Sequence, residues 1–111
     1  MELDISTERD GGVCAVTVKG EVDVYTSPKL KEQLVTGMQD DCSLMIVSLD
    51  GVGFIDSSGL GVLVGGLRRM KESGGDFRLV CTREQVLKIL RITGLDKVFP
   101  IAATLDEARG N

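Results

Sequence analysis

The feature of the sequence that most constrains its fold is a nearly continuous apolar run, LMIVSL, at residues 44–49. A run of this kind, without strict alternation of polar and apolar residues, is typical of a strand that is covered on both faces. Such strands have parallel neighbours, and parallel neighbours need a crossover connection, usually a helix. The run therefore predicts an α/β domain in which helices precede and follow this strand.

Helix and strand patterns alternate on both sides of the run. Ser27 and Pro28 predict a helix start, with the serine as N-cap, and apolar residues at every fourth position extend that helix to Gln39. A second helix follows residues 56–58 and ends at the glycine pair 74–75. The remaining predicted elements are a strand at 77–81, a helix that opens with a capping box at 82–85 and ends at Gly94, an extended segment at 98–101, and a short helix that opens with a capping box at 104–107.

The first part of the chain predicts a hairpin. Strands at residues 3–7 and 13–18 flank Asp10-Gly11-Gly12, where glycine accepts the positive φ of a tight turn. Residues 20–23 then lead from the second strand into a loop. The expected fold is a mixed, largely parallel sheet that is opened by this hairpin and accompanied by about four helices. The length of 111 residues suits one domain, residues 1–111.

Charge and composition argue against several classes of function. The net charge is −4 and no basic stripe is visible, so we expect no direct contact with nucleic acid. The acidic N-terminus lacks the pattern of a signal peptide, and no apolar run is long enough to span a bilayer, so we expect a cytoplasmic protein without membrane association. Cys14, Cys42 and Cys81 lie in or beside apolar runs and are expected to serve as small buried hydrophobes, with a redox role as the alternative. No exposed apolar stripe is obvious, which favours a monomer when unbound.

The sequence also lacks the residues of common active sites. It has no histidine, which excludes Ser-His-Asp and Cys-His catalytic pairs and histidine-ligated metal sites. It has no P-loop, and the glycines at 59, 61 and 65 do not have the spacing of a dinucleotide fingerprint. We therefore expect a protein that is not an enzyme, with no catalytic residue, no metal site and no cofactor.

The most informative segment is VGFIDSSGLG at residues 52–61. Asp56, Ser57 and Ser58 fall where the chain enters the second helix, and their oxygens suit the unpaired backbone donors of a helix N-terminus. A phosphate there would be tolerated by the helix dipole. A partner that buried the serine, however, would have to desolvate about −1.5 to −2 charges beside Asp56. Phosphorylation could therefore switch a binding surface without a large rearrangement.

Glycines are frequent in the helix that follows. Each lowers helix stability by about 1 kcal/mol relative to alanine. They either let the helix lie close to the sheet or clear space for the backbone of a partner. We expect the second role for Gly59 and Gly61, which lie nearest the serines, and leave both roles open for Gly65 and Gly66.

Three motifs, in order along the chain, resemble those of bacterial anti-sigma-factor antagonists, which are single STAS domains. DSSGLGV at residues 56–62 is similar to the phosphoacceptor signature of the family. GEVD at 20–23 resembles the loop after its second strand, and ITGLDKVF at 92–99 resembles the exit of its third helix. The resemblance covers nearly the whole chain, and residues 25–30 and 91–100 look most like the actinobacterial branch.

The resemblance implies the STAS fold and a partner-switching function. The unphosphorylated protein would bind an anti-sigma factor that is also a serine kinase, and this binding would release a sigma factor. The kinase would use ATP and magnesium to phosphorylate the antagonist and so eject it, and a PP2C-type phosphatase would reset it. The ATP site and the catalytic base would belong to the partner.

The resemblance also assigns roles to residues. The acceptor in the family is the first hydroxyl after the aspartate, which is Ser57 here, with Ser58 as the alternative. Asp56 would orient the acceptor and its loop. Asp23 would contact the kinase, although a solvated turn aspartate is the competing interpretation. The partner-facing start of the helix would comprise Gly59, Leu60 and Gly61.

Other regulatory functions stay open on the sequence. The three cysteines permit a redox-gated binder, and a nucleotide-binding STAS module is a second alternative, against which the missing P-loop and histidine argue. A scaffold subunit like those of stressosomes is a third alternative, but such proteins usually carry an additional N-terminal domain.

Overall fold

The computed structural model describes residues 3–39 and 41–110, and it contains a five-stranded sheet in the order β1-β2-β3-β4-β5. The strands are β1 (Leu3–Asp10), β2 (Val13–Val22), β3 (Leu44–Ile55), β4 (Asp76–Val80) and β5 (Ile101–Ala102). β1 pairs with β2 in an antiparallel hairpin, and every later strand is parallel to the one before it. The prediction of a mixed, largely parallel sheet opened by a hairpin is confirmed.

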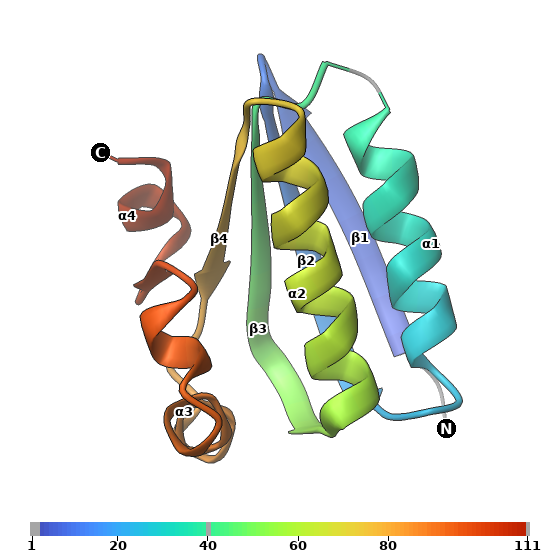
Figure 1. Cartoon of the computed structure of the whole chain (residues 1–111), viewed down its shortest axis with the longest axis vertical. Helices are drawn as coiled ribbons and strands as arrows, with labels where there is room; N and C mark the ends of the chain where they lie inside the picture. The colour runs from blue at the N-terminus through green and yellow to red at the C-terminus, as the bar shows by residue number, and fades with distance from the viewer. Residues whose placement is uncertain (1–2, 40, 111) are drawn as a thin grey trace.

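Helices connect successive strands, and a last helix follows β5. They are α1 (Ser27–Met38), α2 (Ser57–Glu72), α3 (Glu84–Ile92) and α4 (Leu105–Arg109), with a 3-10 turn at Leu95–Lys97. α1 and α2 lie side by side along one face of the sheet, whereas α4 lies beside β4 at the other edge of the view (Figure 1). None of the helices in the described part of the chain is long and apolar enough to cross a membrane.

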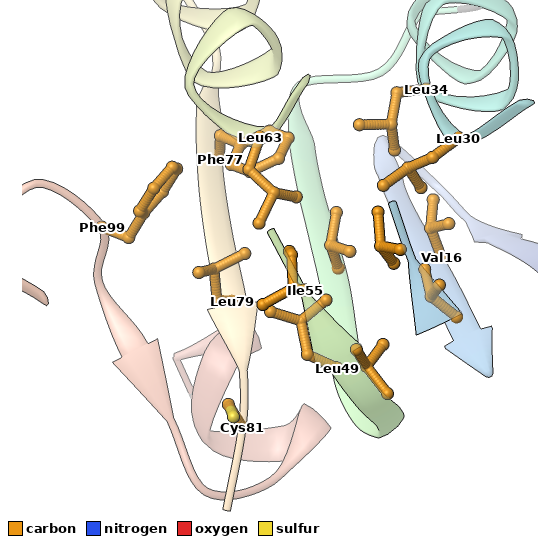
Figure 2. Packing of buried hydrophobic residues seen from close by; sticks show 14 of the residues in the cluster. Val16, Leu30, Leu34, Leu49, Ile55, Leu63, Phe77, Leu79, Cys81 and Phe99 are labelled. Atoms are coloured by element: carbon orange, nitrogen blue, oxygen red, sulfur yellow. The ribbon is translucent and has the colours of Figure 1, made fainter. Parts of the chain in front are cut away.

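The main core lies between the sheet and the helices. Leu30 and Leu34 of α1, Leu63 of α2 and Phe77 of β4 are almost fully buried and lie between the helices and the sheet (Figure 2). Gly66 of α2 is part of this packing, because a Cβ atom there would come within 2.8 Å of the Phe77 ring. Close approach of α2 to the sheet is therefore the reason for this glycine.

Two of the predicted helix starts, those of α1 and α3, are correct in place but wrong in their capping residues. The N-cap of α1 is Thr26 and not Ser27, and its hydroxyl donates to the Glu21 carbonyl rather than capping the helix. The N-cap of α3 is Arg83, without a side-chain cap. The capping box predicted at 82–85 is absent because Thr82 bonds to a carboxylate of β3 instead. The capping box of α4, between Thr104 and Glu107, is confirmed.

Two segments differ from the predicted secondary structure. β2 continues through Val22, so residues 20–22 are strand and not loop, although the pairing with β3 is irregular on either side of Gly20. The extended segment predicted at 98–101 is largely absent, because the chain forms the 3-10 turn first and β5 begins only at Ile101. The hairpin turn is as predicted, and Gly11 has φ of +63°.

Candidate functional site

Two loops meet where β2 and β3 end. Val22 and Ile55 are paired in the sheet, and the N–H of Asp56 donates to the carbonyl of Val22 at 3.1 Å. The β2–α1 loop, which carries Asp23, therefore lies next to the β3–α2 turn, which carries Asp56 and Ser57. Both loops lie at the lower end of the molecule as viewed in Figure 1. Asp23 and the acceptor turn, predicted as one site, are thus on adjacent loops.

Asp56 is the N-cap of α2. Its backbone is extended, and its Oδ1 accepts hydrogen bonds from the N–H groups of Ser58 at 2.9 Å and Gly59 at 3.2 Å. The Ser58 hydroxyl donates to the same oxygen. These hydrogen bonds, that of the Ser58 hydroxyl above all, hold the pKa of Asp56 below its ordinary value of 3.8. Asp56 is therefore ionised at neutral pH.

The two candidate hydroxyls have different surroundings. Ser57 is the first residue of α2 and is exposed, and within residues 3–39 and 41–110 nothing forms a hydrogen bond with its hydroxyl. Ser58 is half-buried, and its hydroxyl proton is directed at Asp56. The Ser57 hydroxyl is therefore free to meet a phosphoryl donor, whereas that of Ser58 is already engaged.

Asp23 shapes its own loop. Its Oδ1 accepts from the N–H groups of Tyr25 at 2.9 Å and Thr26 at 3.0 Å. In return, the Asp23 N–H donates to the Thr26 hydroxyl at 2.9 Å. Reciprocal bonds of this kind are typical of aspartate in turns. Asp23 thus has a structural role, and its contact with a kinase stays a prediction.

The three residues after the serines lie in different environments. Gly59 is buried, and a Cβ atom there would lie 2.5 Å from Val22 and 2.8 Å from Ile55. The expectation that Gly59 clears space for a partner is therefore corrected, because its own sheet fills that space. Leu60 is also buried, at 8 % exposure, in the core. Only Gly61 is exposed, with nothing within 4 Å of a Cβ position.

Sequence reasoning missed that three apolar residues near the site are exposed. Val24 and Tyr25, in the β2–α1 loop, are 62 % and 88 % exposed, and Phe54, near the end of β3, is 46 % exposed. Large exposed apolar side chains beside a candidate site are typical of protein interfaces. The available signal was Tyr25, the only tyrosine of the chain, next to Val24 in a short loop.

The three thiols are poorly suited to reaction. Cys14 and Cys81 are buried, and Cys42 is half-buried. Burial, together with a hydrogen bond to Cys14, raises the pKa of the Cys42 thiol to about 12. Burial also raises the pKa of Cys81. Because the thiolate is the reactive form, these environments disfavour the redox-gated alternative. The residues that the structure describes also include no group of three or more Cys, Asp or Glu placed to hold a metal ion.

Comparison with known proteins gives a consistent result. The family model described as "STAS domain" matches residues 4–108. The anti-sigma-B factor antagonist of Bacillus subtilis (strain 168) is 34 % identical over 103 residues, which are 93 % of this chain and 94 % of that protein.

Solved structures agree with the sequence comparison. An anti-sigma factor antagonist from Mycobacterium paratuberculosis superposes with a TM-score of 0.89 at 30 % identity, covering 98 % of this chain and 92 % of the other. SpoIIAA, solved in its unphosphorylated form, shares the fold with a TM-score of 0.82 at 24 % identity, covering 97 % and 98 % of the two chains. The phosphorylated form of SpoIIAA from Bacillus gives 0.74 at 22 % identity, covering 96 % and 97 %.

The two adjoining loops, the aspartate-capped helix start and these matches over nearly the whole length point to one family. The chain belongs to the STAS domain family, among the anti-sigma factor antagonists.

Proposed function

We propose that this antagonist binds an anti-sigma factor with serine-kinase activity while Ser57 is unmodified, and that phosphorylation of Ser57 ends the binding. Binding would release the sigma factor held by that kinase, and a PP2C-type phosphatase would restore the unmodified protein. This exchange would take place in the cytoplasm. The observation that carries the proposal is the exposed, unbonded Ser57 hydroxyl beside the ionised Asp56.

The geometry of the helix start explains how a phosphate would act. Asp56 already occupies the N–H groups of Ser58 and Gly59. A phosphate on Ser57 would therefore stay in solvent next to a carboxylate instead of being absorbed by the helix N-terminus. The fold would tolerate it, since the Ser57 side chain is exposed. A partner that covers Ser57 would have to bury two neighbouring negative groups, which costs about 2–5 kcal/mol of binding free energy.

The surroundings of the acceptor suit a protein partner. Tyr25 is 88 % exposed, its backbone N–H donates to Asp23, and its aromatic side chain is of the kind that dominates interface energetics. Gly59 and Leu60, which are buried, would position the acceptor turn from beneath, while Gly61 would face the partner. Asp56 would hold the turn and keep Ser57 directed outward.

The test uses the purified serine-kinase anti-sigma factors of the source organism in isothermal titration calorimetry. We expect one of them to bind the wild type and the Ser57→Ala variant, and to bind Ser57→Asp at least about 30-fold more weakly. Ser6→Asp is the matched control, because it adds the same charge at an exposed serine of β1. Incubation with magnesium-ATP and peptide mass spectrometry should place one phosphate on Ser57. Phosphate on Ser58, or wild-type affinity of Ser57→Asp, would contradict the proposal.

A further inference from the structure

A groove runs between the two helices that cover the sheet. α1 and α2 lie side by side (Figure 1), and the groove between them has a volume of about 950 Å³. It extends from Ser58, in the acceptor turn, to Ser73, at the far end of α2. Buried Leu34 and Gly66 contribute to its lining. The groove therefore begins at the site described above and continues along the whole length of α2.

Two glycines of α2 line the groove at positions where packing within the protein does not require a glycine. A Cβ atom at Gly61 or Gly65 would meet nothing within 4 Å, in contrast to Gly59 and Gly66, whose Cβ positions are filled by the sheet. Residues four apart lie on the same face of a helix. Glycine weakens a helix interior, so a pair that no internal contact requires needs another explanation. Close approach of an occupant to the α2 backbone supplies one.

The rim of the groove is basic. Lys31 of α1 and Arg68 and Arg69 of α2 line it, and Glu72 is the one acidic side chain among the described residues of the lining. None of these three cations forms an ion pair with any residue in the described part of the chain. The chain as a whole carries a net charge of −4, so this concentration of unpaired positive charge is local. Charge complementarity therefore selects an acidic occupant.

We propose that the groove is the docking site for an amphipathic helix of the anti-sigma factor, with an apolar face and acidic edges. Half-buried Val35, Met38 and Val62 would contact the apolar face, and the two glycines would admit it close to the α2 backbone. The acidic edges would pair with the basic rim. This inference rests on the proposed function, since a kinase that holds Ser57 in its active site already stands at the mouth of the groove.

The experiment fills the groove without harming the fold. Gly65→Leu adds a side chain to open space and improves helix propensity, so its thermal midpoint should not fall below that of the wild type. Binding to the purified anti-sigma factor that recognises the wild type should weaken at least about tenfold in calorimetry, because the occupant is excluded. Thr36→Leu is the control, because it places the same leucine side chain at an exposed position of α1 outside the groove.

The charge of the rim is tested separately. Arg69→Glu should weaken binding and reduce its dependence on salt, whereas Lys88→Glu, an equal change of charge at an exposed position of α3, should not. Loss of binding by Ser57→Asp together with wild-type affinity of Gly65→Leu would overturn the groove and leave the proposed function standing. Loss of binding by Gly65→Leu together with wild-type affinity of Ser57→Asp would support the groove as the docking site and overturn the proposed phosphorylation switch. A wild-type dimer that Gly65→Leu dissociates would overturn the choice of occupant, and failure of every anti-sigma factor to bind the wild type would overturn both proposals.

Discussion

A nucleophilic side chain lies just beyond each end of β3, and the two side chains differ in burial. Cys42 precedes the strand, is half-buried, and forms a hydrogen bond with Cys14 that, with burial, keeps its thiol protonated. Ser57 follows the strand, is exposed, and stands beside an ionised carboxylate. One end of the sheet thus shields its nucleophile, and the other presents it where two loops meet. Accessibility at the loop end, more than intrinsic reactivity, is what makes Ser57 the candidate acceptor.

The largest effect expected from this comparison is in thiol chemistry. At pH 8, a pKa of about 12 in place of the ordinary 9.0 lowers the thiolate fraction of Cys42 about a thousandfold. A more basic thiolate is also more nucleophilic, and this offsets part of the loss of thiolate. We therefore expect alkylation of Cys42 by iodoacetamide to be about 40-fold slower in the native protein than in the same chain unfolded in urea. Peptide mass spectrometry at timed intervals measures both rates. Equal rates in the two states would remove the contrast with Ser57 and revive the redox-gated alternative.

At the acceptor end, the expected effect is on partner affinity. Tyr25→Ala removes an 88 % exposed aromatic ring beside the acceptor turn, and we expect it to weaken binding to the anti-sigma factor about 10- to 30-fold. Ile92→Ala, at a 74 % exposed position at the end of α3, is the control and should leave the affinity unchanged. Calorimetry measures both. Equal losses in the two variants would show that exposure of an apolar residue, and not its place beside Ser57, determines the interface.

The sequence predicts the fold well because its signals are local. The apolar run at 44–49, the hairpin glycines and the glycine stops of the helices each act within a few residues, and the structure agrees with them. The errors arise where a polar side chain bonds to a strand and not to its own helix start. Thr26 donates to the Glu21 carbonyl of β2, and Thr82 bonds to Asp50 of β3, so neither helix start is capped as its pattern predicts.

The candidate site shows the same division. Asp56 as the helix cap follows from local residue preferences, and the structure agrees. The role of Gly59 depends on Val22, which is far away in the sequence, so the motif alone could not distinguish packing from partner contact. The groove between α1 and α2 is likewise a product of tertiary structure. Whether the Ser57 or the Ser58 hydroxyl is available depends on which of the two bonds to Asp56. The sequence alone, with two adjacent serines, does not decide this.

A smaller effect concerns the support of the acceptor turn. Asp56→Ala leaves the N–H groups of Ser58 and Gly59 without their carboxylate acceptor, and we expect about a fivefold larger unfolding equilibrium constant. Asp56→Asn keeps an oxygen acceptor and should retain most of the stability. Urea denaturation followed by circular dichroism measures all three proteins. If Asp56→Asn lowered the stability as much as Asp56→Ala, the negative charge of the carboxylate, and not its hydrogen bonds to the helix N-terminus, would stabilise this end of the sheet.

The smallest effect is the most diagnostic for the two serines. The Ser58 hydroxyl is the main cause of the lowered pKa of Asp56, so Ser58→Ala should raise that pKa toward its ordinary value of 3.8, while Ser57→Ala should not. The lowered pKa of Asp56 stabilises the folded protein at pH values above the ordinary pKa. This contribution to stability is lost as the pH falls through the pKa that Asp56 has in the folded state. Ser58→Ala should therefore lose less stability on acidification than the wild type. Carbon NMR titration of the Asp56 carboxyl measures the pKa directly. If Ser57→Ala raised it instead, the bonded and the free hydroxyl would exchange places, and Ser58 would become the side chain that the acceptor end presents to its kinase.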